Sequence, residues 1–230
     1  LHKLVPAGID LSQIEGKIVA VDDEQENKDK LDENKLIVCL DAGHGGKDNG
    51  SDYRLRYEKN DNLKITQAVA AYLADKENIQ VIMTRSDDTF LSLEERTTFA
   101  NQNNADYFVS LHRNTGEGNG VETWIRSDAD DKTQALAQNI MDNLDAAGIS
   151  RNRGVKKGTQ KSGSKDYYVN LHTNMPACIV ELGFMNSPTD NQLFDANVEN
   201  YAKAIGDAVL KTYEAYGKDG ADAKESVEDV

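Results

Sequence analysis

The sequence predicts a single α/β domain with a mostly parallel sheet and helices on both of its faces. Predominantly apolar runs of strand length recur along the chain, at residues 36–40, 79–84, 107–112, 121–126 and 177–184. Segments with the apolar spacing of amphipathic helices lie between these runs. Alternating strands and helices are typical of parallel sheets, and strands without polar alternation are typical of burial on both faces.

The length and charge distribution of the chain indicate one domain with a tail at each end. A chain of 230 residues is long enough for one α/β core and too short for two. We predict the folded domain at residues 35–217, an N-terminal linker or tail at 1–34, and an acidic C-terminal tail at 218–230. Residues 21–34 and 218–230 contribute −8 of the net charge of −14. Both tracts lack an apolar face to bury, so we expect them to be solvated.

The first predicted elements lead to a glycine-rich turn. A candidate short strand spans residues 16–21, and the first buried strand, 36–40, is stopped by the segment 41–46, Asp-Ala-Gly-His-Gly-Gly. A helix is predicted at 58–75. In parallel sheets ligands bind at the carboxyl ends of strands, so the polar residues that end each apolar run are candidates for function.

Three further helices are predicted along the chain. The helix at 92–103 begins with Ser92 as its N-cap and has Glu95 three residues later, which is the pattern of a capping box. Two later helices are predicted from residues that share one helical face: Leu136, Ile140 and Leu144 in the first, and Val198, Tyr201, Ala202, Ile205, Val209, Thr212 and Tyr216 in the second.

Composition excludes several classes of protein. The net charge of −14 argues against a nucleic-acid partner, because phosphate binding relies on clustered lysine and arginine. No apolar run approaches the roughly 20 residues of a transmembrane helix. Cys39 and Cys178 each lie in an apolar run without CxxC spacing, so we expect neither a disulfide framework nor a cysteine metal site.

Four residues at predicted strand ends and helix starts could carry chemistry. His44 follows the first buried strand and His112 follows another, so the two imidazoles should meet at one edge of the sheet. Glu58 begins the next helix, and two histidines with one carboxylate are a recurrent ligand set for catalytic zinc. Each also has a plainer interpretation: His44 as a turn residue, Glu58 as a first-turn acid favoured by the helix dipole, and His112 as a capped strand end.

Glu181 is the fourth candidate, because it lies inside the apolar run Cys178-Ile179-Val180-Glu181-Leu182. A buried carboxylate is costly without a partner, so it requires a metal, a water, a substrate proton or a buried cation. No lysine or arginine stands near it in the sequence.

Four motifs follow one another along the chain: Asp41-Ala42-Gly43-His44-Gly45-Gly46-Lys47-Asp48, Glu58-Lys59-Asn60, Ser110-Leu111-His112-Arg113-Asn114 and Asn174-Met175-Pro176-Ala177-Cys178-Ile179-Val180-Glu181-Leu182-Gly183-Phe184. In these motifs and their order, over about residues 35–216, the chain resembles the zinc-dependent N-acetylmuramoyl-L-alanine amidases of the type-3 amidase family. The resemblance implies a six-stranded, mostly parallel sheet, zinc as the cofactor with His44, Glu58 and His112 as ligands, and Glu181 as the catalytic glutamate.

The resemblance also implies the reaction and its place. The expected activity is hydrolysis of the amide between N-acetylmuramic acid and L-alanine in peptidoglycan by a zinc-bound water, with Glu181 as general base. We expect a monomer that acts as an autolysin outside the cytoplasm, secreted or in the cell wall, with any export signal missing from this chain. The alternatives are a catalytically silent peptidoglycan-binding or regulatory module of the same fold, and a metallohydrolase for another amide.

Substrate contacts are expected from Arg113, Asn114, His172 and Asn174. Arg113 departs from the family pattern, in which a small residue usually follows the second ligand histidine, so the pocket should differ in shape there. For His172 the alternative is an exposed loop histidine. The long insert that forms an autoinhibitory helix in some relatives is absent, which predicts a site that is open without an activator.

A basic stretch stands out in this acidic chain. Residues 151–165 contain six basic residues and no acid. We interpret the stretch either as a patch that attracts the carboxylates of a peptide stem or an anionic wall polymer, or as a solvated glycine-containing loop.

Overall fold

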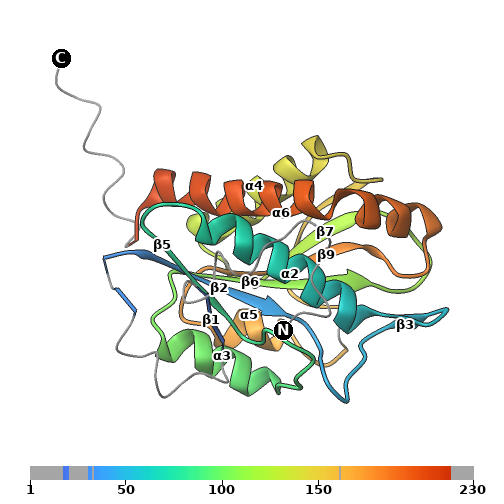
Figure 1. The fold of residues 1–230 in the computed structure, drawn as a ribbon, viewed down its shortest axis with the longest axis horizontal. Helices are drawn as coiled ribbons and strands as arrows, with labels where there is room; N and C mark the ends of the chain where they lie inside the picture. The colour runs from blue at the N-terminus through green and yellow to red at the C-terminus, as the bar shows by residue number, and fades with distance from the viewer. Residues whose placement is uncertain (1–17, 21–30, 33, 161, 219–230) are drawn as a thin grey trace.

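The computed structural model describes residues 18–20, 31–32, 34–160 and 162–218, and it confirms the predicted single α/β domain (Figure 1). The central sheet has seven strands in the order β1-β5-β2-β6-β9-β7-β8. The strands are β1 (Ile18–Ala20), β2 (Leu36–Ala42), β5 (Ile79–Met83), β6 (Tyr107–Asn114), β7 (Val121–Ile125), β8 (Asn152–Lys157) and β9 (Ala177–Phe184). Every neighbouring pair is parallel except β7 and β9.

Six of these strands form the sheet that the resemblance implied, and β1 adds a seventh at the edge beside β5. β1 lies within the candidate short strand at 16–21, so the N-terminal segment takes part in the sheet through these residues. β8 lies in the basic stretch 151–165. The interpretation of that whole stretch as a loop is therefore wrong.

Helices cover both faces of the sheet, as predicted (Figure 1). One face carries α2 (Glu58–Ala74), α4 (Asp131–Ala146) and α6 (Pro188–Tyr216), and the other carries α3 (Leu93–Gln102) and the short α5 (Tyr168–His172). None of the helices in the described part of the chain has the length and apolar character that a membrane-spanning helix needs.

Strand β2 shows how one apolar run supplies both cores. Leu36, Val38 and Leu40 belong to the core beneath α2, α4 and α6, whereas Ile37 and Cys39 pack with α3 and α5. All seven residues of β2 are buried. Burial on both faces explains why the sequence of this strand is continuously apolar.

Local sequence signals fix several element ends. Ser92 caps α3 and forms the predicted capping box with Glu95, each bonding the backbone N–H of the other. A short antiparallel hairpin leads directly into α2. Its two strands, β3 (Asp52–Tyr53) and β4 (Arg56–Tyr57), have two residues each. The hairpin therefore places Glu58 at the first position of α2.

The C-terminal boundary lies slightly beyond the predicted one. Lys132 of α4 donates to the carbonyl oxygens of Gly217 (2.8 Å) and Lys218 (2.7 Å), and Lys218 forms an ion pair with Asp106 at 3.3 Å. Lys218 therefore packs on the domain and is not part of a solvated tail. Most of the predicted tails, 1–17, 21–30 and 219–230, lie outside the described residues, and their solvation stays a prediction.

Candidate metal centre

His44, Glu58 and His112 meet at the carboxyl edge of the sheet, as the sequence predicted. His44 follows β2, His112 lies near the end of the neighbouring strand β6, and Glu58 begins α2. One potential ligand atom from each residue lies within 4.8 Å of the other two. Glu58 Oε1 is 2.9 Å from His112 Nδ1 and 3.3 Å from His44 Nε2.

The carboxylate of Glu58 is held from several directions. Its Oε2 accepts from the backbone N–H of Ser51 at 2.8 Å. Its Oε1 accepts a hydrogen bond from the backbone N–H of Arg113 at 3.2 Å and another from Asn62 Nδ2 at 3.3 Å. Burial opposes ionisation of Glu58, but the imidazoles of His112 and His44 hold its pKa well below its usual range. Glu58 is therefore anionic at neutral pH, as a carboxylate ligand of a metal must be.

The ring of His44 is oriented by Asp48. Nδ1 of His44 lies 2.8 Å from Asp48 Oδ2, which leaves Nε2 directed at Glu58. A carboxylate behind a ligand imidazole typically fixes its tautomer and orientation. Burial alone would lower the pKa of His44, but hydrogen bonds with Glu58 and Asp48 raise it to about 9. Protons therefore compete with a metal ion for this ring.

Two glycines provide the space for these rings. A Cβ atom on Gly43 would lie 2.1 Å from Cε1 of His112, and a Cβ atom on Gly50 would lie 2.6 Å from Cδ2 of His44. A Cβ on Gly50 would also lie 2.7 Å from Glu58 Oε2. Any side chain at either position would displace a candidate ligand, so both glycines are part of the candidate site.

His44 adopts an unusual backbone conformation. Its φ is 62°, in the left-handed region that a residue with a side chain rarely adopts. Such a conformation costs on the order of 1–3 kcal/mol and persists only where the surrounding structure imposes it. The donor set of two imidazoles and one carboxylate fits a divalent ion such as zinc, with room for further ligands.

Glu181 lies beside this donor set. In the sheet it is the register partner of His112 on β6 and of Glu122 on β7, so the three side chains lie on one face. Its Oε2 is buried and has no hydrogen-bond partner among the described residues. Burial raises the pKa of Glu181 to about 7. A carboxylate with that pKa can both accept and donate a proton near neutral pH.

These groups line a cavity of about 580 Å³. The polar part of its wall contains the three candidate ligands and Glu181, and another part is formed by residues 90–93 and 167–169. Phe90, Leu93 and Tyr168 of these segments are partly exposed. A polar centre beside an apolar wall suits a substrate with both amide and hydrocarbon groups.

Sequence reasoning missed Glu122, which is buried next to Glu181. It accepts hydrogen bonds from Asn114 Nδ2 at 3.0 Å and Trp124 Nε1 at 3.1 Å, and Arg153 Nε donates to it at 2.7 Å. The available signal was the one that identified Glu181, a carboxylate inside an apolar strand run.

The structure places the side chain of Arg113 beside α2 and α6. Its guanidinium is fully buried, donating to Asp61 Oδ2 at 2.6 Å and to Asn191 Oδ1 at 2.7 Å, with Phe194 4.4 Å away. These partners belong to α2 and α6, so the guanidinium is directed to the helices. Arg113 itself borders the cavity described above, so a substrate contact by another part of this residue stays a prediction.

The other three expected contacts differ in position. Asn114 lines the cavity. His172 and Asn174 are exposed and are not among the residues that line it. His172 stacks on Tyr168 with ring centroids 3.8 Å apart, and its Nδ1 donates to the Tyr168 carbonyl at 2.9 Å. His172 is thus an exposed histidine behind a residue of the cavity wall, which was the alternative interpretation.

A mostly parallel sheet flanked by helices gathers a His-Glu-His donor set and a carboxylate with a buried, unpartnered oxygen at one edge. This combination is typical of a metallohydrolase. The family model described as N-acetylmuramoyl-L-alanine amidase matches residues 38–211. The chain belongs to that family.

Known proteins similar to the chain agree with this assignment. Uncharacterized protein YqiI of Bacillus subtilis strain 168 is 36% identical over 182 residues, which are 78% of this chain and 84% of that protein. The sporulation-specific N-acetylmuramoyl-L-alanine amidase of the same organism is 31% identical, over 66% of this chain and 58% of that protein. The crystal structure of N-acetylmuramoyl-L-alanine amidase from Clostridium difficile 630 is similar to this chain, with a TM-score of 0.73 and 33% sequence identity. The match covers 80% of this chain and 100% of that chain.

Proposed function

We propose that this protein hydrolyses the amide bond between N-acetylmuramic acid and L-alanine in peptidoglycan. His44, Glu58 and His112 hold zinc, and Glu181 is the general base. The observation that carries the proposal is the meeting of three potential ligand atoms within 4.8 Å beside a buried, unpartnered carboxylate oxygen. Because peptidoglycan lies outside the cytoplasmic membrane, the enzyme acts in the cell wall or after secretion.

Amide hydrolysis needs an activated nucleophile and a protonated leaving group. Zinc bound at this site supplies Lewis-acid chemistry, lowering the pKa of a water toward about 7 and polarising the substrate carbonyl. Glu58 contributes negative charge to the ligand set, and Asp48 keeps the Nε2 atom of His44 directed inward. Gly43 and Gly50 carry no side chain that would collide with the ligand side chains.

Glu181 moves the proton. Its carboxylate accepts a proton from the attacking water as the water oxygen bonds to the carbonyl carbon of the lactyl group. It then delivers this proton to the alanine nitrogen as the C–N bond breaks, which yields a lactyl carboxylate and a free amino group. The pKa of about 7 suits both transfers, because neither protonation state is strongly favoured at neutral pH.

Mass analysis of digested peptidoglycan tests the reaction. Purified cell walls treated with the protein should release stem peptides with a free N-terminal alanine and leave glycan strands with unsubstituted lactyl groups. Cleavage within the stem peptide instead would identify a peptidase. Binding to the walls without any new end group would identify the silent binding module.

Removal of the metal tests the cofactor. A chelator should abolish turnover, and zinc should restore it, because the ligand set holds the only ion that the proposed chemistry uses. We also expect full activity of the purified chain without an added activator protein, since the family's autoinhibitory insert is absent. Turnover that survives complete metal removal would contradict the zinc assignment.

A further inference from the structure

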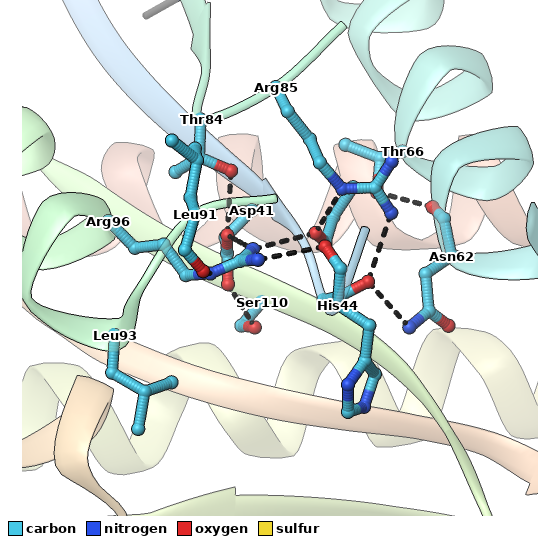
Figure 2. A network of polar contacts seen from close by, with 12 residues as sticks. Asp41, His44, Asn62, Thr66, Thr84, Arg85, Leu91, Leu93, Arg96 and Ser110 are labelled. Carbon is cyan, nitrogen blue, oxygen red and sulfur yellow. Dashed lines mark hydrogen bonds and ion pairs between the residues drawn. The ribbon is translucent and has the colours of Figure 1, made fainter. Parts of the chain in front are cut away.

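Two buried arginines reach the loop that carries His44 from two sides (Figure 2). Arg85 follows β5, and Arg96 lies in α3. Neither residue belongs to the donor set or to a motif used above. Both are buried, with 2% of their surface exposed, so their polar groups need hydrogen-bond partners.

Arg96 joins the end of β2 to the ligand residue itself. Its Nη1 donates to Asp41 Oδ1 and to the Ala42 carbonyl, both at 2.7 Å, and its Nη2 donates to the His44 carbonyl at 2.8 Å. One planar guanidinium thus fixes the carbonyls of Ala42 and His44 relative to each other (Figure 2).

Arg85 joins the same loop to the helix that carries Glu58. Its Nε donates to the Ala42 carbonyl at 2.9 Å, and its Nη2 donates to the carbonyls of Gly43 at 3.0 Å and Lys59 at 2.9 Å. Lys59 follows Glu58 in the first turn of α2. Arg85 therefore connects the segments that supply two of the three candidate ligands.

The two guanidinium groups also hold one wall of the cavity. Arg85 Nη1 donates to the Asp87 carbonyl at 2.7 Å, and Arg96 Nε donates to the Leu91 carbonyl at 3.2 Å. Residues 90–93 line the cavity. The position of this wall is thus linked to the position of the ligand loop.

The loop needs such support because His44 is strained, with a φ of 62° in the left-handed region. Gly45 and Gly46, with φ values of 132° and 55°, adopt positive φ without this cost. In the described part of the chain, the hydrogen bonds of Arg85 go to backbone carbonyls and not to a carboxylate. The acceptors lie on three separate segments, at residues 42–43, 59 and 87, which favours a role in geometry.

We propose that Arg85 and Arg96 are positioning residues. They fix the backbone of the loop that carries His44 and hold the cavity wall at residues 90–93 in a constant position relative to that loop. The inference rests on the proposed metal site. A lysine at either position keeps the charge but loses the planar set of donors, so geometry and charge can be separated.

The test measures the zinc dissociation constant of Arg85→Lys and Arg96→Lys by competition with a chelating indicator, alongside urea unfolding of each protein. Zinc binding should weaken about 10- to 100-fold, the usual range for loss of groups that orient metal ligands. With saturating zinc, kcat should recover while KM stays raised, because the displaced wall is not restored by the metal. Arg85→Lys gives a second route if Arg96→Lys does not fold, since Asp41 is not a hydrogen-bond partner of Arg85.

Lys132→Met is the matched control. Lys132 is also a buried cation that donates to two backbone carbonyls, those of Gly217 and Lys218, away from the metal centre. The Lys132→Met variant should be less stable than the parent, because the two carbonyls lose their donor. Its zinc dissociation constant should stay at the parental value. Parental zinc affinity in both folded arginine variants overturns the inference. Parental affinity in His44→Ala overturns the proposed metal site instead, so the two failures are distinguishable.

Discussion

Asp41, at the end of β2, shows how individual residues couple stability to the site. Its Oδ1 accepts from Thr84 Oγ1 at 2.6 Å and from Arg96, and its Oδ2 accepts from Ser110 Oγ at 2.6 Å. Burial would raise the pKa of Asp41, but Arg96 and the two hydroxyl groups lower it from 3.8 to about 2.

This lowered pKa predicts a specific loss of stability in acid. The unfolded chain binds the proton of Asp41 near pH 4 and the folded chain only near pH 2, so the stabilisation is complete above pH 4 and is lost as the pH falls through 2. The contribution is about 2 kcal/mol. Urea unfolding from pH 7 to pH 2 should show the stability difference between parent and Asp41→Asn shrinking by that amount. A difference that stays constant over this range would contradict the assignment.

At the same scale, the sequence identified residues whose type is unusual for their setting. The meeting of His44, Glu58 and His112 could be predicted because each stands at a strand end or a helix start. Glu181 could be singled out because it is charged inside an apolar run. The same reasoning could not place Arg113, because whether a side chain after a strand end points to the cavity or to a helix depends on tertiary packing. The roles of Arg85 and Arg96 were also hidden, since their partners are backbone carbonyls distant in sequence.

At the scale of elements, strand β8 differs from the others. The buried strands were predictable from continuous apolar runs, whereas β8 is an edge strand of mostly partly exposed or exposed residues, Asn-Arg-Gly-Val-Lys-Lys. Its pairing with β7 comes from backbone hydrogen bonds, which leave no apolar pattern in the sequence. The strand leads to Gln160, which lines the cavity.

The basic residues of this edge are expected to attract an anionic substrate. Replacing Lys156, Lys157 and Lys165 together by Gln should raise KM and leave kcat unchanged, because the lysines lie outside the donor set. The effect should shrink at high ionic strength. As a control, Lys203→Gln with Lys211→Gln removes exposed lysines from α6 and should leave KM unchanged. Parental KM in the triple variant at low salt would show that the edge is merely solvated.

At the scale of the whole molecule, apolar patterning predicted a core that runs from β2 to the end of α6, but β1 lies in the segment predicted as an N-terminal linker or tail. The sequence could not predict that Lys218 packs on the domain, because this depends on Lys132 and Asp106 lying beside the end of α6. The strand at 18–20 was recognised as a candidate, but its pairing with β5 required the structure.

Two truncations test this boundary. Removing residues 219–230 should leave the melting temperature and turnover unchanged, because that acidic tract has no apolar face to bury. Removing residues 217–230 should lower the melting temperature, since Lys132 then loses two carbonyl acceptors and Asp106 loses its ion pair. Equal melting temperatures for the two truncated chains would contradict the role given to Gly217 and Lys218.

Two glutamates in one cavity have different proposed roles: Glu58 holds the metal, and Glu181 moves the proton. Each can be changed to glutamine, which keeps the size of the side chain and removes its charge. Glu199→Gln, on the exposed face of α6, is the control and should behave like the parent.

The most direct measurement is zinc content and turnover of Glu181→Gln and Glu58→Gln, determined side by side. Glu181→Gln should keep its zinc and lose about 10²- to 10⁴-fold in rate, the usual cost of losing a general base, and excess zinc should restore nothing. Glu58→Gln should lose zinc, and excess zinc should restore part of its activity. Loss of zinc from Glu181→Gln, or near-parental turnover of that variant with zinc bound, would contradict the account.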